Sequence, residues 1–151
     1  MQRKGLGLFI GVLAAVGASI PALADTTPED AKDYRASIMT VLRGHVGAAS
    51  MIARGLVDNN GQLEAHADGL VNAAAELENI FPEGSNVEGS ESLPAIWENP
   101  EEFQAAIDKL VTAAANFKEV AGSGDRAAIG GAFREVGLSC RGCHDNFRQS
   151  N

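Results

Sequence analysis

The residues best suited to chemistry lie near the C-terminus, in the segment Cys140-Arg141-Gly142-Cys143-His144, which holds both cysteines of the 151-residue chain. On a helix, thiols three residues apart lie within one turn, on the side that also carries His144. Each thiol can form a thioether with one of the two vinyl groups of a haem, and the histidine can ligate the iron. This C-x-x-C-H pattern is the haem attachment motif. It predicts one covalent haem c held by Cys140 and Cys143, with His144 as metal ligand.

Four other interpretations of the cysteine pair are weaker. A disulfide is permitted in an oxidising compartment, but on a continuing helix it would be strained, and it gives His144 no role. A thioredoxin-type redox pair lacks the expected βαβ surroundings. Half of a zinc site would need further ligands, and only His45 and His66 remain. A chance match is improbable when the motif uses the only cysteines of the chain.

Residues 1–24 have the composition of a cleaved secretory signal. The first four residues include two cations, no charge follows up to Ile20, and the segment ends in a small-residue A-x-A pattern. A membrane anchor is the alternative, but it requires about 20 strongly apolar residues, and this stretch is shorter and rich in glycine and alanine. We therefore expect cleavage after Ala24, export to the bacterial periplasm, and one mature domain, residues 25–151.

The mature domain is acidic. The full chain has a formal charge of −8, and loss of the signal removes Arg3 and Lys4 but no acid, which leaves −10. Such a charge disfavours nucleic acid and anionic lipid as partners, so we expect a redox protein partner with a basic surface. No later stretch is apolar and long enough to span a bilayer, so we expect no membrane association after cleavage.

Apolar residues recur every three or four positions in four segments, which predicts four amphipathic helices. Capping residues, prolines at the first helical position and terminal glycines mark their ends. The expected helices are Pro28–Arg54 after the N-cap Thr27, residues 62–80 after the turn at Gly61, residues 100–121 after the N-cap Asn99, and a last helix from Asp125 through the cysteine motif. The fold class is therefore all-α, an antiparallel four-helix bundle.

The pattern also predicts which residues face inward and where the bundle has its one long connection. The inward stripe of the first helix is expected to contain Tyr34, Ile38, Val41, Leu42, His45, Ala49 and Ile52. Between Phe81 and Glu98 prolines and glycines interrupt the periodicity, which indicates a surface crossing between helices 2 and 3. Phe81 and Trp97 are expected to anchor this crossing to the body.

Several segments together resemble the class II c-type cytochromes, the family of cytochrome c′ and its low-spin relatives. They are Tyr34 to Met39, Phe81 to Ser85, Pro94 to Glu98, and Cys140 to Arg148. The likeness covers nearly the whole mature chain. Only the attachment motif is specific by itself; the other segments indicate the family jointly.

The resemblance implies roles for two arginines as part of the haem site. Arg35 matches an arginine that lies by the haem propionates; the alternative is a solvated surface cation. Arg148 matches an arginine beside the iron-ligating histidine, where it can tune the iron; the alternative is a frayed tail. The family often has a polar residue directly after the first arginine, and Ala36 departs from that pattern, which puts one propionate contact in doubt.

Met39 matches the position that faces the iron opposite the histidine. In low-spin members this methionine is the sixth ligand, and in cytochrome c′ the residue only blocks the site. A thioether can bind iron and raise its potential, whereas most helix methionines simply pack in a core. His45 and His66 are expected to be a packed and a surface histidine.

Two functions follow. The main prediction is a non-enzymatic electron carrier with His144 and Met39 as metal ligands. The alternative is a five-coordinate, high-spin protein in which Ile38, Met39 and Leu42 line a pocket for nitric oxide or carbon monoxide. Peroxide chemistry lacks a recognisable His–Arg pair. The resemblance also makes a homodimer through the first two helices possible, since Gly47 and Gly55 permit close approach.

Overall fold

The computed structural model describes residues 25–150, so the predicted signal, residues 1–24, lies outside the described residues. The elements are helices α1 (Pro28–Ala53), α2 (Gln62–Ala75), α3 (Ala95–Glu98), α4 (Pro100–Ala121) and α5 (Arg126–Phe147), with a 3₁₀ turn η1 (Glu76–Asn79) after α2. Within the described part of the chain the only β pairing is one isolated bridge, between Ser92 and Arg148. The prediction of an all-α bundle is confirmed.

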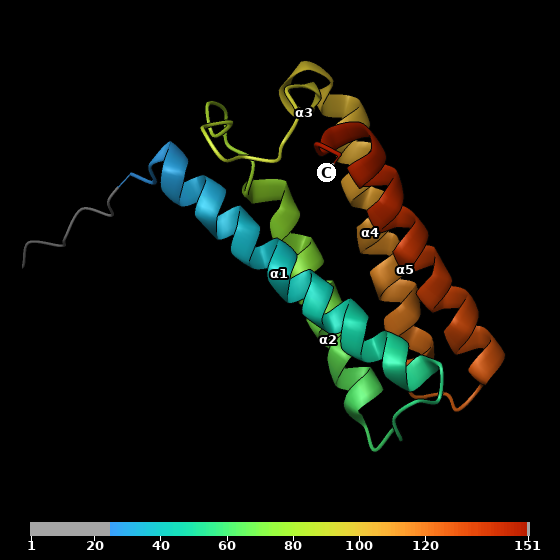
Figure 1. The fold of residues 1–151 in the computed structure, drawn as a ribbon. Helices are drawn as coiled ribbons and strands as arrows, with labels where there is room; N and C mark the ends of the chain where they lie inside the picture. The colour runs from blue at the N-terminus through green and yellow to red at the C-terminus, as the bar shows by residue number, and fades with distance from the viewer. Residues whose placement is uncertain (1–24, 151) are drawn as a thin grey trace, which may run out of the picture.

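The four long helices form two antiparallel pairs (Figure 1). α1 packs along α2, α4 packs along α5, and α2 joins the pairs by packing on α4. α1 and α5 approach each other over a shorter stretch. The end of α5 reaches the level of the short helix α3, so the C-terminus lies beside the crossing between α2 and α4. None of the described helices is both long enough and apolar enough to cross a membrane.

Local signals explain most helix boundaries. The Thr27 side chain accepts a hydrogen bond from the Asp30 amide at 3.1 Å, and the Asp125 carboxylate accepts from two amides at the start of α5, which is the geometry of an N-cap. Asn99 occupies the N-cap position of α4, but its side chain makes no capping bond. Its amide is still bonded to the Ala95 carbonyl of α3, and its backbone (ψ 62°) therefore departs from cap geometry.

The apolar stripes of the inner helices lie in the core as predicted. The buried residues include Leu63, Leu70, Ala73 and Ala74 of α2, Leu77 of η1, and Phe103, Ile107, Leu110, Ala114, Phe117 and Ala121 of α4. On α1 the prediction is partly wrong, because Tyr34 and Val41 are 51% and 44% exposed. α1 has fewer neighbours than α2, so it buries a narrower face, on which Arg35 takes the inward place expected for Tyr34.

The crossing between α2 and α4 is partly buried. Trp97 donates a hydrogen bond from its indole nitrogen to the Phe81 carbonyl at 3.1 Å, and both side chains pack against the core, as predicted. The Phe81 ring meets Phe103 edge-on at 4.8 Å, and Phe103 meets Phe147 at 5.0 Å. This row of rings joins the crossing, α4 and the end of α5.

Candidate haem site

The two cysteines and Met39 contact one apolar core, the cysteines from α5 and the methionine from α1. Cys140 and Cys143 are half-buried free thiols on the last turns of α5, and Met39 is half-buried on α1. All three side chains pack against the same cluster of buried residues. The structure therefore brings these three predicted site residues to a common environment, although more than 100 positions separate Met39 from Cys140.

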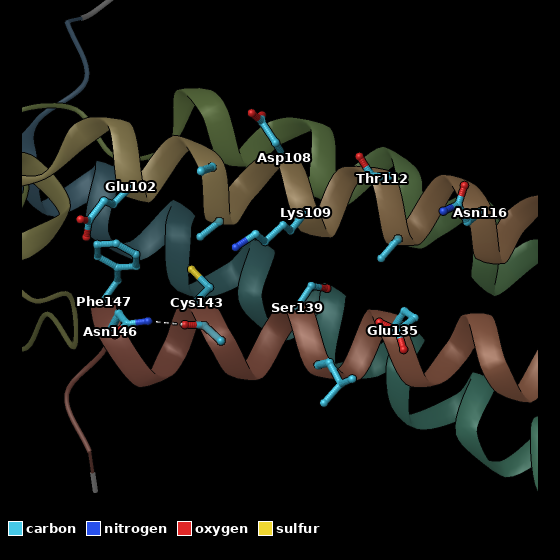
Figure 2. Close-up of a pocket in the computed structure, with 15 residues that line it drawn as sticks. Glu102, Asp108, Lys109, Thr112, Asn116, Glu135, Ser139, Cys143, Asn146 and Phe147 are labelled. Carbon is cyan, nitrogen blue, oxygen red and sulfur yellow. Dashed lines mark hydrogen bonds between the residues drawn. The ribbon is translucent and has the colours of Figure 1, made fainter.

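Cys143 faces α4. It lines an open groove of about 840 Å³ between α4 and α5, and its sulfur points across the groove on the side of Lys109 (Figure 2). Glu102, Asp108 and Glu135 line the same groove, together with the cation Lys109. The second thiol of the motif is thus reached from an acidic surface.

Both thiols are held in the protonated form. Burial raises the pKa of Cys140, opposed by a hydrogen bond from its own backbone. Burial, with a further contribution from Cys140, raises the pKa of Cys143 to about 11. Redox-active cysteine pairs depend instead on a lowered thiol pKa. The raised pKa values therefore do not support the redox interpretation, whereas thioether formation adds the S–H group of each cysteine across a vinyl group.

His144 stands at the exposed edge of α5, four residues after Cys140 and on the same side of the helix. Partial burial lowers the pKa of His144, and the positive charge of Arg148 lowers it further, while the carboxylates of Asp145 and Glu91 act in the opposite direction. The balance favours the neutral imidazole, which is the form that binds a metal.

Arg35 is a buried cation with neutral partners. It is 5% exposed, so the surface-cation alternative is wrong. Its guanidinium donates to the Ile80 carbonyl, to the hydroxyl and carbonyl of Ser85, each at 3.0 Å, and to the Ser90 hydroxyl at 3.3 Å. It also lies 5.0 Å from the centre of the Phe81 ring. Burial lowers the pKa of Arg35, and no ion pair with Arg35 occurs among the described residues.

Arg148 has the opposite surroundings. Its guanidinium pairs with the Glu91 carboxylate through Nε at 2.8 Å and Nη2 at 2.7 Å, near the surface. The backbone on both sides is held as well: the Leu93 amide donates to the Phe147 carbonyl, and the Gln149 amide donates to the Glu91 carbonyl. The tail is therefore not frayed, and Arg148 lies close enough to influence His144.

The sequence argument missed the residues that hold these arginines. Ser85, Ser90 and Glu91 belong to the crossing, where no periodicity marks a residue as buried or paired. The only local signal is a pair of tight turns, since Gly84 and Gly89 have φ values of +81° and +79°, a conformation that favours glycine. Two neighbouring residues of the crossing thus bind different arginines: Ser90 binds Arg35, and Glu91 binds Arg148.

These features fit a covalently held haem. Two protonated thiols face an apolar core, a histidine favours its neutral form, and a buried guanidinium without an acidic partner would match a propionate. The arrangement offers a polar edge at the crossing and an apolar interior between α1 and α5. When bound, the haem supplies an iron that can change oxidation state or coordinate a small ligand.

Comparison with known proteins agrees with this assignment. The family model for cytochrome c′ matches residues 30–148. Cytochrome c′ of Rubrivivax gelatinosus is 33% identical over 124 residues, covering 81% of this chain and 96% of that protein. Cytochrome c-554 of Cereibacter sphaeroides is 32% identical over 140 residues, covering 88% and 91%.

The fold leads to the same family. A nitric oxide complex of a point mutant of cytochrome c prime from Alcaligenes xylosoxidans superimposes with a TM-score of 0.78 at 28% identity, covering 85% of this chain and 100% of that chain. Sequence, fold and attachment motif therefore show that the chain belongs to the cytochrome c′ family, class II c-type cytochromes that carry covalently attached haem c.

Proposed function

We propose that this chain binds a small diatomic gas, nitric oxide or carbon monoxide, on the side of its haem opposite His144. The observation that carries the proposal is the apolar surface of α1 at the position that faces the iron in the family. Ile38 and Leu42 are 8% and 7% exposed, and Met39 between them packs half-buried against the same core. This reverses the order of the two functions expected from the sequence.

The chemistry of α1 suits a neutral ligand. Among the buried residues of α1 in the described structure, Arg35 alone is polar, and its donors are directed to the crossing. A diatomic gas needs no proton donor to bind, whereas cleavage of a peroxide bond does. Apolar side chains also exclude water from the approach to the iron. The relative whose fold matches this chain was solved as a nitric oxide complex, which supports the same assignment.

Electron transfer with Met39 as sixth ligand is the second candidate. The observation in its favour is that Met39, a residue with a ligating thioether, is directed to the same core as the two haem-binding cysteines. A fixed pair of axial ligands would keep the coordination unchanged between oxidation states. The two candidates therefore differ in whether the Met39 sulfur binds the iron.

Absorption spectra of the purified haem protein, oxidised and reduced, separate the candidates. Gas binding predicts broad high-spin bands and a spectral change when carbon monoxide is added to the reduced protein. Sharp low-spin bands with no response to carbon monoxide would exclude the gas-binding proposal and support the electron carrier.

Met39→Leu sharpens the test, because leucine keeps the volume and apolar character but removes the sulfur. If Met39 only packs, the absorption spectrum stays the same. The carbon monoxide affinity then changes by less than about threefold, which corresponds to about 0.7 kcal/mol or less. If Met39 is a ligand, the variant turns from low to high spin and its potential falls. Met51→Leu is the matched control, since Met51 is exposed on the same helix and should leave both properties unchanged.

Export and partner choice belong to the same proposal. The signal-like residues 1–24 and the acidic mature chain support a periplasmic protein that meets basic partners. The groove beside Cys143, with Glu102, Asp108 and Glu135, is the surface on which a basic redox protein would approach the haem edge. Pairing of two copies through α1 and α2 is compatible with the exposed Tyr34 and Val41. Analytical ultracentrifugation of the mature protein tests that pairing.

A further inference from the structure

The two histidines outside the haem motif meet between α1 and α2. The chain has three histidines, and His45 and His66 are the two that do not belong to the attachment motif. Their Nδ1 atoms lie 3.1 Å apart, and the rings meet edge-on with centroids 5.4 Å apart. Both side chains are half-buried, so solvent still reaches the pair. Neither the haem site nor its partners use these residues.

The backbone of α2 makes room for this contact. A Cβ atom at Gly69 would lie 2.3 Å from Cε1 and 2.4 Å from Nε2 of the His45 ring, which is far inside contact distance. The ring therefore lies directly on the helix backbone, and only glycine at position 69 permits its present place. This packing holds the His45 ring beside α2, where it meets His66.

We propose that His45 and His66 form a binding site for a divalent transition-metal ion, with copper(II) bound most tightly. Imidazole nitrogens are good ligands for copper, nickel and zinc, and copper(II) stands highest in the affinity order. Two nitrogens 3.1 Å apart, each about 2.0–2.1 Å from one ion, subtend an angle of roughly 95–102° at that ion. This lies between the ideal angles of square and tetrahedral coordination. To share one ion, each Nδ1 lone pair must turn by roughly 40° from the line that joins the two nitrogens.

The two protein ligands leave coordination positions for water. In the described part of the chain no group of three or more histidine, cysteine or acidic side chains comes together, so no third such ligand joins the pair. Nearby acids of α2 are engaged elsewhere: Glu64 accepts from Asn59, and Asp68 pairs with Lys118 at 2.8 Å. An open site of this kind binds the ion exchangeably and links α1 to α2.

Proton balance permits the site. The 3.1 Å contact requires one ring with a protonated Nδ1 and one with a bare Nδ1. When an ion takes both Nδ1 lone pairs, the donor ring carries its proton on Nε2 instead. A pair in which both rings are neutral thus supplies two metal ligands without net release of a proton.

The test is calorimetric titration of the haem-loaded mature protein with copper(II), in which His144 serves as haem ligand. We expect one ion per chain, and a loss of affinity of at least about tenfold in His45→Gln and in His66→Gln. Asp108→Asn is the control for binding at exposed carboxylates and should bind like the unaltered protein. Equal binding by all four proteins, or no binding at all, would overturn the proposal.

A spectroscopic measurement on the unaltered protein keeps the proposal testable if a histidine variant fails to fold. Electron paramagnetic resonance of the copper(II) form should show hyperfine coupling to two imidazole nitrogens. Melting temperature should also rise on addition of the ion, because an ion that binds only the folded state stabilises it. A copper signal with oxygen ligands alone would show that the pair is only a hydrogen bond between helices.

Discussion

Arg35 and Arg148 hold the same crossing segment by opposite means. Arg35 is buried and donates only to neutral oxygens of Ile80, Ser85 and Ser90. Arg148 lies near the surface and pairs with the Glu91 carboxylate. We therefore expect the ion pair, although more conspicuous, to contribute less to stability. Exposed pairs are screened by water, whereas a buried polar group left without a partner is costly.

Replacement of Arg35 tests the buried hydrogen bonds and should have the largest effect on stability. Arg35→Met keeps an apolar chain of similar length but leaves the carbonyls of Ile80 and Ser85 without donors, each worth about 1–3 kcal/mol. The removed cost of burying a charge offsets part of this loss. We expect the free energy of unfolding of the haem-loaded protein to fall by roughly 2–4 kcal/mol in urea titrations followed by circular dichroism.

The loss of stability in Arg35→Met should also be insensitive to salt. Because Arg35 is buried, its interactions are little screened, and raising the ionic strength should leave the effect of the substitution unchanged. A loss below about 1 kcal/mol, or one that disappears at high salt, would show that Arg35 acts as a surface cation.

Ser85 should show an intermediate effect. Its hydroxyl is fully buried, accepts from Arg35 and donates to the Pro82 carbonyl at 2.7 Å. Ser85→Ala removes both bonds and should lower the free energy of unfolding by about 1–2 kcal/mol. Ser37→Ala is the matched control, since the Ser37 hydroxyl bonds a helix carbonyl at the surface and should matter by less than about 0.5 kcal/mol. Equal effects of both variants would refute the ranking.

Arg148→Gln tests the exposed ion pair with Glu91 and should have the smallest effect on stability. An exposed ion pair contributes about 0–1 kcal/mol, and the difference from the unaltered protein should shrink as salt is added. Arg134→Gln, whose partner is only its neighbour Glu135, is the control and should change nothing measurable. If Arg148→Gln destabilises the protein as much as Arg35→Met, the expected difference between the buried hydrogen bonds and the exposed ion pair is wrong.

Much of the fold could be predicted because its signals are local. The caps at Thr27 and Asp125, the proline at the start of α4 and the apolar spacing on α2 and α4 each depend on residues within one or two turns. The stripe on α1 could be predicted only in part. Periodicity identifies a set of possible inward faces, but the width of the buried face depends on how many helices surround it.

The candidate site divides in the same way. Cys140, Cys143 and His144 are recognisable because the chemistry of haem attachment requires neighbouring residues on one helix. The partners of Arg35 and Arg148 are 45 to 57 residues away in the chain, in a segment without a periodic pattern. Only the three-dimensional structure could identify these partners.

The sequence by itself determined the haem attachment motif, the four helices and the acidic character of this protein, since each depends on composition or on contacts within a few residues. The tertiary structure alone decided that Arg35 is buried against the crossing, that Met39 shares a core with the cysteines, and that His45 meets His66. These contacts join helices whose order along the chain leaves their relative rotation and approach open. That rotation is set by the packing of many side chains together, and no single segment encodes it.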